Sequence, residues 1–419
     1  MHNVMAVILA GGRGDRLSIL AAERAKPAVP FGGKYRLIDF TLSNCVNSGI
    51  RKVAVVAQYL PRSLAQHLGD GRSWGLDFPG GGGFTMLQPY MTRTSQDWYE
   101  GTADAIYHNM RFIESQKAKQ IVVLAGDHVY TMRYDLMLAA HRHNGADVTV
   151  GVIEVPLEDA SRFGVMTLDN NNMVMSFEEK PAKPQSTLVS MGIYVFNRDT
   201  MVRLLEEDAA ISTSKHDFGH DIIPSCLGKC KVMGYRFRGY WRDVGTIESY
   251  WQANMDLVVD LPPLNLYDME NELRTSLKIE PPVKFGPYAT VRRSIIANGA
   301  IVNGTVSNSV ISPRTYVEEG AVVSDSILFH DTHIGKGSII HRSIIDKQVW
   351  VGHAAKIGFG DDYTVNRLEP GVFNTGITVV GKGSRIPSHT IIGRNCKIGC
   401  WVKDSQFPSA NIASGSTIE

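Results

Sequence analysis

Two patterns of apolar residues divide the chain. From residue 1 to about residue 260, short apolar runs typical of buried strands alternate with stretches in which apolar residues recur at helical spacing. The runs predict strands at residues 4–8, 53–56 and 121–124, and the helical spacing predicts helices at residues 104–117 and 246–257. This alternation is typical of an α/β domain with a mostly parallel sheet covered by helices. Ligands of such sheets bind beyond the carboxyl ends of the strands.

A 17-residue repeat occupies the C-terminal part of the chain. Aliphatic residues recur at this interval in two sets, Val317, Ile334 and Val351, and Val323, Ile340 and Ile357. Each interval divides into three short steps, which predicts a triangular parallel β-helix whose coils bury ladders of aliphatic side chains. Residues 361–378 break the repeat, and we expect them to form an excursion before it resumes at Val380. Prolines between residues 262 and 287 indicate a linker, so we predict domains at residues 1–261 and 288–419.

Charge and apolar run length exclude several classes of protein. The formal net charge is +1, so no global field directs this chain to nucleic acid or to an anionic membrane. No apolar run has the length needed to cross a bilayer. The first apolar run leads directly into a glycine-rich stretch, so we interpret it as a first strand and not as a secretory signal.

The cysteine content indicates reduced thiols. Five cysteines are an odd and sparse number, which is typical of a cytoplasmic enzyme. Two pairs have a spacing that can chelate zinc, Cys226 with Cys230 and Cys396 with Cys400. No flanking histidine completes either pair, and the pairs lie in different predicted domains. We therefore interpret them as buried thiols.

The stretch from Leu9 to Leu17 directly after the first strand is rich in glycine. Gly11, Gly12 and Gly14 allow backbone N–H groups to converge on an anion. Arg13 and Arg16 add planar, permanently charged donors suited to phosphate oxygens. When the stretch is considered alone, an ordinary glycine-rich turn between a strand and a helix is the favoured alternative.

Two lysines precede prolines and are candidate anion ligands. A residue before proline favours extended backbone, so we expect Lys26 to project as a fixed cation toward the glycine loop. Lys180 repeats this arrangement before Pro181, which suggests a second anionic ligand such as a sugar phosphate. A solvated surface lysine is the alternative for Lys26.

Two carboxylates and one helix start are further candidates. Asp127 ends a strongly apolar strand, where its oxygens could hold Mg²⁺. Asp243 is a second candidate ligand, although it could instead cap the helix that follows it. Small residues near Gly101 would admit a flat base against the backbone, with Thr102 as the cap; a plain helix start is the alternative.

Together these motifs resemble a known family. The short ones are residues 11–17, 26–27, 126–127 and 179–181, and they resemble the sugar-1-phosphate nucleotidyltransferases. The longer ones are residues 24–34, 217–224 and 240–246, and they are similar to those of the glucose-1-phosphate adenylyltransferase family, the ADP-glucose pyrophosphorylases. The resemblance covers both halves of the chain. It implies a Rossmann-like nucleotidyltransferase domain followed by a left-handed parallel β-helix.

The resemblance also implies an activity. Family members transfer AMP from ATP to α-D-glucose 1-phosphate, giving ADP-glucose and pyrophosphate for the synthesis of glycogen or another α-glucan. It implies Mg²⁺ as cofactor, a cytoplasmic homotetramer, and allosteric regulation by a phosphorylated metabolite. Because the attacking phosphate is already anionic, the enzyme mainly positions its substrates and neutralises charge.

Roles for individual residues follow from the same resemblance. The implied catalytic residues are Arg16, Lys26 and Asp127. The implied metal ligands are Asp127 and Asp243. The nucleotide would contact Leu9, Ala10, Gly11, Gly12, Gly14, Gly101 and Asp127. Glucose 1-phosphate would contact Tyr99, Gly164, Glu179, Lys180 and Ser190. The implied regulatory residues are Gln58, Trp98 and Arg36.

The chain departs from this family at the implied effector site. Relatives activated by fructose 1,6-bisphosphate can carry a basic residue just before the position of Arg24 and another near Pro30. This chain has Glu23 and Pro30 at those places, although Arg36 remains nearby. We expect regulation by a different activator, or by one that binds weakly.

Three other functions remain open. The glycine loop does not read the base, so UTP, dTTP or GTP could replace ATP. Hexapeptide β-helices also form acyl-CoA sites, for which the candidate bases are His330, His333, His341 and His353. A catalytically silent regulatory subunit would share the fold, but such a subunit would be expected to lose the charged site residues that this chain keeps.

Overall fold

The computed structural model describes residues 1–419 except residues 2, 13, 78–81, 90–97 and 277. Contacts divide the chain into two units. The first comprises Met1–Gly12, Phe40–Tyr240 and Met269–Arg274, and the second comprises Arg13–Asp39, Trp241–Asp268 and Thr275–Glu419. The segment after the glycine loop is therefore part of the same unit as the C-terminal repeats. The domain boundaries at residues 261 and 287 stay a prediction.

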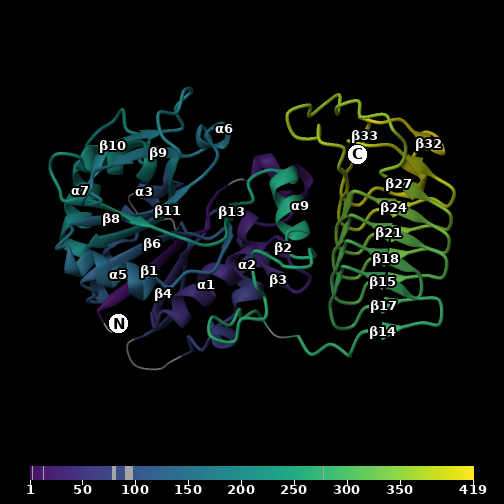
Figure 1. Ribbon diagram of the computed structural model, residues 1–419, viewed down its shortest axis with the longest axis horizontal. Helices are drawn as coiled ribbons and strands as arrows, with labels where there is room; N and C mark the ends of the chain where they lie inside the picture. Colours follow the sequence, from purple (N-terminus) through teal and green to yellow (C-terminus); the bar gives the residue numbers. More distant parts are fainter. Residues whose placement is uncertain (2, 13, 78–81, 90–97, 277) are drawn as a thin grey trace. The chain divides into compact units, whose positions relative to one another are not determined.

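A mixed sheet forms the centre of the first unit (Figure 1). Its strands are β1 (Val4–Leu9), β4 (Lys52–Val56), β5 (Gly83–Leu87), β6 (Gln120–Ala125), β8 (Val148–Glu154), β9 (Gly164–Leu168), β10 (Val174–Glu179), β11 (Leu188–Asn197) and β12 (Val232–Arg236). Among the described residues the order is β10-β9-β11-β6-β1-β4-β5, with β8 between β11 and β12. β6, β1, β4 and β5 pair in parallel, which confirms the predicted α/β class, whereas β11 pairs antiparallel with β6, β8 and β9.

Helices and short segments complete the first unit. They are α1 (Leu37–Asn47, which begins in the second unit), α2 (Pro61–Leu68), η3 (Arg72–Trp74), α3 (Thr102–Tyr107), α4 (Met110–Ser115), β7 (His128–Tyr130), α5 (Tyr134–His143), α6 (Leu157–Ala160), α7 (Arg198–Ala209), η4 (Phe218–Ile222) and α8 (Ile223–Cys226). The single helix predicted at residues 104–117 is wrong, because a turn separates α3 from α4. There the Asn109 side chain donates to the Ala105 carbonyl, and such a bond competes with the helical backbone.

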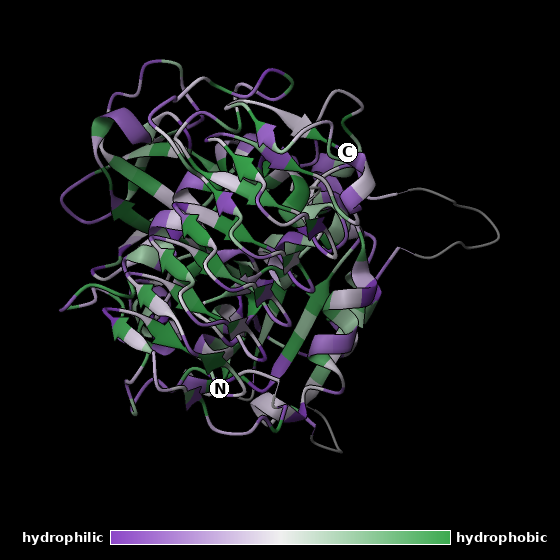
Figure 2. Cartoon of the chain, turned by 90° about the vertical axis from the view of Figure 1, so that its right-hand side faces the viewer, coloured by the Kyte–Doolittle hydropathy of each residue, from purple (hydrophilic) through white to green (hydrophobic). Residues whose placement is uncertain are grey.

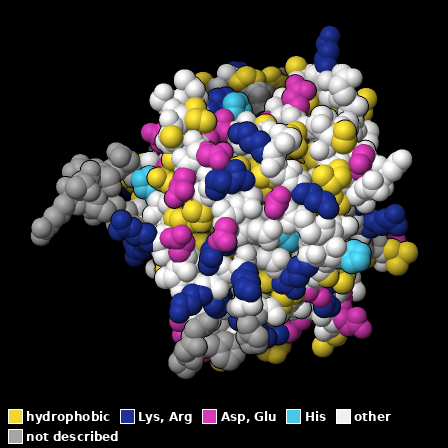
Figure 3. All heavy atoms as spheres, turned by 90° about the vertical axis from the view of Figure 1, so that its left-hand side faces the viewer, with side chains coloured by type: hydrophobic (Ala, Val, Ile, Leu, Met, Phe, Trp, Pro, Cys, Tyr) yellow, Lys and Arg dark blue, Asp and Glu magenta, His cyan; other side chains and the backbone are white. Residues whose placement is uncertain are grey.

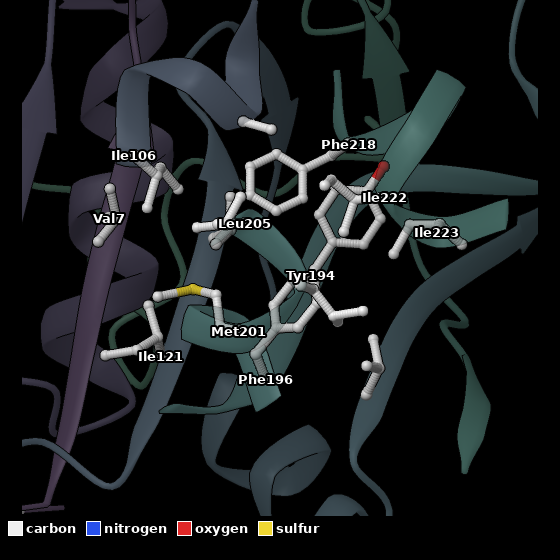
Figure 4. Packing of buried hydrophobic residues seen from close by; sticks show 14 of the residues in the cluster. Val7, Ile106, Ile121, Tyr194, Phe196, Met201, Leu205, Phe218, Ile222 and Ile223 are labelled. Carbon is white, nitrogen blue, oxygen red and sulfur yellow. The ribbon is translucent and has the colours of Figure 1, made fainter. Parts of the chain in front are cut away.

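An aromatic cluster packs η4 onto the sheet of the first unit (Figure 4). The Phe218 ring lies 5.7 Å from the rings of both Tyr194 and Phe196 on β11. Met201 and Leu205 of α7 are buried in the same cluster. This apolar packing fixes the segment that contains Asp217 and Gly219 beside β11.

Segments from distant parts of the chain join the repeats in the second unit. They are η1 (Asp15–Ala21), η2 (Lys26–Ala28), β2 (Pro30–Phe31), β3 (Tyr35–Arg36), β13 (Trp241–Asp243) and α9 (Ile247–Met255). The Trp251 indole of α9 donates to the Asp325 carbonyl in the repeats at 2.8 Å. The Tyr250 ring lies 6.3 Å from the Phe329 ring, edge to face.

The repeats form a parallel β-helix with three sheets, as predicted (Figure 1). The first contains β14 (Lys284–Phe285), β17 (Ile301–Val302), β20 (Tyr316–Val317), β23 (His333–Ile334), β26 (Trp350–Val351) and β29 (Arg385–Ile386). The second contains β15 (Thr290–Arg292), β18 (Thr305–Ser307), β21 (Val322–Ser324), β24 (Ile339–His341), β27 (Lys356–Ile357), β30 (Ile391–Ile392) and β32 (Asn411–Ile412). The third contains β16 (Ile295–Ile296), β19 (Val310–Ile311), β22 (Ile327–Leu328), β25 (Ser343–Ile345), β28 (Thr378–Val380), β31 (Lys397–Ile398) and β33 (Thr417–Ile418), and η5 (Asp404–Gln406) lies between strands.

Burial of one aliphatic side chain per short strand explains the 17-residue interval. Val317 pairs with Ile334 and Ile334 with Val351, and all three side chains are fully buried. Figure 2 shows hydrophobic residues concentrated on the short strands. The excursion is confirmed: β25 pairs with β28 directly, so residues between β27 and β28 leave the repeat.

The surface charges, the helix lengths and the cysteines can be compared with the sequence analysis. On the face in Figure 3, basic and acidic side chains alternate among the coloured atoms, without a large area of one sign. Within the described ranges, no helix is long and apolar enough to span a membrane. The five cysteines are free; Cys45, Cys226 and Cys396 are buried, and Cys230 and Cys400 are partly exposed.

Candidate active site

In the first unit, the glycine loop and Asp127 follow two neighbouring strands. Leu9 at the end of β1 pairs with Ala125 at the end of β6, and the Gly126 N–H donates to the Leu9 carbonyl at 3.0 Å. The loop after Leu9 and the carboxylate of Asp127 therefore leave the same edge of the sheet. Asp127 Oδ1 lies 3.7 Å from His128 Nε2, and its side chain is partly exposed.

Internal packing does not require glycine at the start of this loop. A Cβ added to Gly12 would have no atom within 4 Å, and one added to Gly11 would make ordinary contacts with Gln58. Open space beside an exposed glycine backbone suits the close approach of a ligand. Gly14, in contrast, has φ +74°, where glycine is favoured for conformational reasons. Arg13 lies outside the described residues.

In the second unit, Lys26 and Asp243 form an ion pair beside Arg16. Lys26 Nζ lies 3.3 Å from Asp243 Oδ1, and both side chains are nine-tenths buried or nearly so. A Cβ on Gly245 would lie 2.8 Å from Asp243 Oδ2 and 3.3 Å from Arg16 Nη2. Glycine at this position leaves room for the two side chains on either side of it. Three charged groups predicted to handle phosphate chemistry thus lie together in one unit.

The surrounding backbone resolves two alternatives. Thr246, and not Asp243, caps α9: its hydroxyl accepts from the Ser249 N–H at 3.1 Å, within a capping box. Thr246 thus fills the capping role that the sequence left open for Asp243. Similarly, Thr102 does not cap α3; its hydroxyl donates to Asp217 at 2.8 Å.

Extended backbone at the lysines before proline is a wrong prediction. Lys26 is the first residue of the 3-10 helix η2, closed by a bond from the Val29 N–H to the Lys26 carbonyl. Lys180 has a left-handed φ of 48°, and its N–H donates to the Phe163 carbonyl. Local hydrogen bonds and ion pairs outweigh the steric preference at both places.

Two glycines surround the Glu179 carboxylate in the first unit. Glu179 pairs with Gly164 across β10 and β9. An added Cβ would lie 2.8 Å from Glu179 Oε2 at Gly164 and 2.5 Å from the same oxygen at Gly219. Lys180 Nζ contacts Glu179 Oε1 at 2.7 Å and remains largely exposed. The pair thus combines a fixed carboxylate with a cation open to solvent.

Ser190 and Tyr99, predicted to contact glucose 1-phosphate, and Gly101, predicted to contact the nucleotide, also lie in the first unit. The Ser190 hydroxyl accepts from the Gly192 N–H at 3.2 Å and contacts the Tyr194 hydroxyl at 3.4 Å. The Tyr99 hydroxyl accepts from the Asn109 amide at 2.9 Å. A side chain at Gly101 would collide with the His216 carbonyl, so packing alone explains glycine there.

The predicted regulatory residues Gln58 and Trp98 each contact the sequence neighbour of the other. Gln58 is buried, and its amide donates to the Tyr99 carbonyl at 3.4 Å. Trp98 is 64% exposed, and its ring stacks on that of Tyr59 with centroids 6.4 Å apart. Gln58 and Tyr59, shortly after the end of β4, therefore contact Tyr99 and Trp98, shortly before α3.

Arg36 belongs to a cationic cluster in the second unit. Burial lowers the pKa of Arg36 to about 10 despite the nearby carboxylate of Asp39. Burial, together with the charges of Arg36 and Arg24, lowers the pKa of Lys347 to about 7. Arg24 is almost fully buried and bonds to Asp346 at 2.8 Å through Nη2, while its Nη1 has no partner among the described residues. The cluster has more positive than negative charge, so an anion would stabilise it.

Glu23, one of the departures noted in the sequence, contacts the β-helix. Its carboxylate pairs with Lys382 at 2.9 Å and accepts a hydrogen bond from the Trp401 indole. Burial opposes ionisation of Glu23, but these bonds outweigh it and lower its pKa. An acidic side chain thus neutralises a lysine at the edge of the cationic cluster.

The chemistry of Asp127 and Asp243 fits a magnesium ion. Both are carboxylates with hard oxygen ligands, and no group of three His, Cys, Asp or Glu within the described residues could hold a metal alone. Mg²⁺ is usually bound by one or two carboxylates together with substrate phosphates. Asp127 lies in the first unit and Asp243 in the second, so their joint role stays a prediction.

Sequence reasoning missed several participants. Gly219 and Gly245 lie in motifs that the sequence singled out, but their steric roles appear only with the neighbouring carboxylates in place. Asp346 and Lys347 lie in the repeats, where the corner after Ile345 carried no recognised signal.

Comparisons with known proteins show the family to which this chain belongs. A family model described as nucleotidyl transferase matches residues 5–259, and one described as GlmU-like, C-terminal hexapeptide matches residues 281–380. The glucose-1-phosphate adenylyltransferase of Thermomicrobium roseum is 51% identical over all of this chain and 98% of its own length. That of Thermotoga neapolitana is 51% identical over all of this chain and 99% of its own, and that of Acetivibrio thermocellus is 44% identical over 100% and 98%. The hexapeptide match agrees with a left-handed β-helix. The chain therefore belongs to the glucose-1-phosphate adenylyltransferase family.

Proposed function

We propose that this chain transfers AMP from ATP to α-D-glucose 1-phosphate, releasing pyrophosphate and ADP-glucose for glycogen or another α-glucan. The full-length similarity to glucose-1-phosphate adenylyltransferases carries this proposal. The chain keeps Arg16, Lys26, Asp127, Lys180 and Asp243, which argues against a silent regulatory subunit.

The proposed reaction is an in-line displacement. A phosphate oxygen of glucose 1-phosphate attacks the α-phosphorus of ATP, and pyrophosphate leaves. The attacking oxygen is already anionic, so no side chain has to remove a proton. Arg16 and Lys26 supply positive charge where negative charge accumulates, and the glycine loop admits the triphosphate to the backbone.

The first unit supplies the sugar phosphate site in this proposal. Lys180 holds the phosphate, and its contact with Glu179 orients it. Gly164 and Gly219 leave room for the Glu179 carboxylate, which can accept hydrogen bonds from sugar hydroxyls. Mg²⁺ bound by Asp127 and Asp243 would neutralise phosphate oxygens and orient them.

Replacement of Asp127 tests this function. Asp127→Asn keeps the shape of the side chain but removes its charge, and we expect kcat to fall about a hundredfold or more. Pyrophosphate release is the measurement, with Asp135→Asn as control, because Asp135 pairs with Arg133 on the surface and has no proposed role. Near-normal turnover of Asp127→Asn would remove the assigned role. A panel of ATP, UTP, dTTP and GTP distinguishes the proposed activity from the same chemistry with another base.

We also propose a phosphorylated effector at the cationic cluster of Arg24, Arg36 and Lys347. Burial and, to a lesser extent, the neighbouring cations lower the pKa values of Arg36 and Lys347, and an anion there would stabilise their charged forms. Glu23 already neutralises Lys382, so we expect fructose 1,6-bisphosphate to activate weakly or not at all. A strong, saturable response to it would contradict this. The proposed assembly is a cytoplasmic homotetramer, which light scattering of the purified protein tests.

A further inference from the structure

Ser18 has an unusual backbone conformation two residues after Arg16. It interrupts η1 with φ 45° and ψ −124°, a left-handed conformation that favours glycine. The residues on either side of this kink, Leu17 and Ile19, are buried. The orientation of the Arg16 side chain therefore depends on a backbone turn that serine does not prefer.

A distant carboxylate stabilises this turn. The Ser18 hydroxyl donates to Glu369 Oε2 at 2.6 Å, although 351 residues separate the two in sequence. Glu369 Oε1 accepts from Lys397 Nζ, also at 2.6 Å. Burial opposes ionisation of Glu369, but the bonds from Lys397 and Ser18 outweigh it and lower its pKa. A charged acceptor makes this hydrogen bond a strong one.

The backbone around Glu369 is itself fixed. Glu369 lies in the excursion of the β-helix between β27 and β28, and its N–H donates to Asn366 Oδ1 at 2.9 Å. The Asn366 side chain is fully buried and donates to the carbonyls of Asn395 and Ser416 in the repeats. These bonds transmit the rigidity of the solenoid to the Glu369 carboxylate.

We propose that Glu369 is a positioning residue for the transfer reaction, which acts through Ser18 to orient Arg16. The excursion of the β-helix thereby has a direct role in the nucleotide site of the same unit. The proposal rests on the role assigned to Arg16 under the proposed function.

Two glutamates on one lysine provide the test. Lys397 pairs with Glu369 at 2.6 Å and with Glu419 at 2.9 Å, but the Ser18 hydroxyl donates to Glu369 and not to Glu419. We expect Glu369→Ala to lower kcat about tenfold, with KM for glucose 1-phosphate within about twofold of the parent. Glu419→Ala should leave both values unchanged. A kcat in Glu369→Ala equal to that of Glu419→Ala overturns the proposal.

Substitutions of Ser18 separate backbone strain from the hydrogen bond. Both glycine and alanine lack the hydroxyl and lose the hydrogen bond to Glu369. Glycine adopts φ 45° without strain, whereas alanine is strained there. We expect Ser18→Ala to lose more kcat than Ser18→Gly, at equal KM for glucose 1-phosphate. A kcat of Ser18→Ala equal to or higher than that of Ser18→Gly contradicts the proposal. These variants also answer the question if Glu369→Ala does not fold.

A double-mutant cycle with Arg16 identifies the route of the effect. If Glu369 acts through Arg16, Glu369→Ala causes no further loss of kcat in an Arg16→Ala background. Multiplied losses would mean a general structural effect and would refute the proposal. Full activity of Arg16→Ala alone would refute the assigned role of Arg16, and with it this inference, whereas the nucleotide panel would still test the overall reaction.

Discussion

Gly245 offers a direct test of the geometry around Asp243. An added Cβ would lie 2.8 Å from Asp243 Oδ2, where ordinary contact needs about 3.4 Å or more, so the carboxylate must retreat by roughly 0.6 Å. Lys26 and Asp243 are already 3.3 Å apart, and a hydrogen bond beyond about 3.6 Å is lost. The φ of Gly245 is not in the left-handed range, so alanine adds no backbone strain there, only the contacts with the Asp243 carboxylate and with Arg16 Nη2 at 3.3 Å.

The size of the expected effect follows from the bond that is lost. A hydrogen bond to a charged group contributes about 1.5–3 kcal/mol, which corresponds to roughly a ten- to hundredfold change in rate. We therefore expect Gly245→Ala to lower kcat in the pyrophosphate-release assay by about that factor. Thermal denaturation should change little, because the new methyl displaces charged side chains and not the apolar core.

A matched glycine separates steric displacement from a general effect of alanine. Gly371 lies in the same unit, has no left-handed φ, and a Cβ there would have no atom within 4 Å. Gly371→Ala should keep full activity. If Gly245→Ala does the same, or if the two variants lose activity equally, the reasoning about Asp243, Lys26 and Arg16 is refuted.

Three further variants test other parts of the molecule. Gly219→Ala places a Cβ 2.5 Å from Glu179 Oε2 and should raise KM for glucose 1-phosphate about tenfold or more, with KM for ATP unchanged in steady-state kinetics. Arg24→Met leaves Asp346 as an uncompensated buried charge and should cost about 3–5 kcal/mol of stability, seen as a lower thermal midpoint that Asp346→Leu in the same chain partly restores. The pKa of Lys347 is about 7, below its ordinary value, so Lys347 is charged in the folded protein only as pH falls through that value. Sulfate, which stays doubly charged, should therefore bind more tightly in calorimetry at pH 6 than at pH 8.5, and Lys347→Met should remove most of this difference.

The lowered pKa of Lys347 also makes the stability of the fold depend on pH. The pKa of Lys347 is lowered on folding from the ordinary value of 10.5 to about 7. Between these two pH values the unfolded chain binds the extra proton and the folded chain does not, so stability rises with pH across this window. The cost of burying a charged Lys347 is fully present below about pH 7, where a bound anion would offset it.

Periodic features of the molecule were predictable from sequence. The 17-residue interval fixes which aliphatic residues stack, because each strand buries one side chain on the next coil, and Val317, Ile334 and Val351 are paired as expected. Position at the end of a strand was equally informative: Asp127 follows β6 beside the loop that follows β1. Both inferences rest on regular backbone geometry, which sequence patterns report well.

Contacts between distant residues were not predictable in the same way. Arg24 and Asp346 are 322 residues apart, and no periodicity relates them. The conformations of Ser18 and Lys180 contradict their local preferences, since serine rarely has positive φ and a residue before proline favours extended backbone. At such positions tertiary hydrogen bonds decide the backbone, and they become visible only when both partners are placed.

The division of the chain distributes the proposed chemistry unequally. Residues proposed for glucose 1-phosphate, Tyr99, Gly164, Glu179, Lys180 and Ser190, all belong to the first unit, whereas Arg16, Lys26 and Asp243 belong to the second. The second unit also contains the cationic cluster and the contact of Ser18 with Glu369. Arg24 lies two residues before Lys26, so an anion that changes the position of Arg24 acts on the backbone that carries a proposed phosphate ligand. An effector bound at the cluster should therefore change the handling of ATP more than the affinity for glucose 1-phosphate. In this unit the β-helix contacts the segment that carries Arg16 and Lys26, through the bonds of Glu369 to Ser18 and of Asp346 to Arg24.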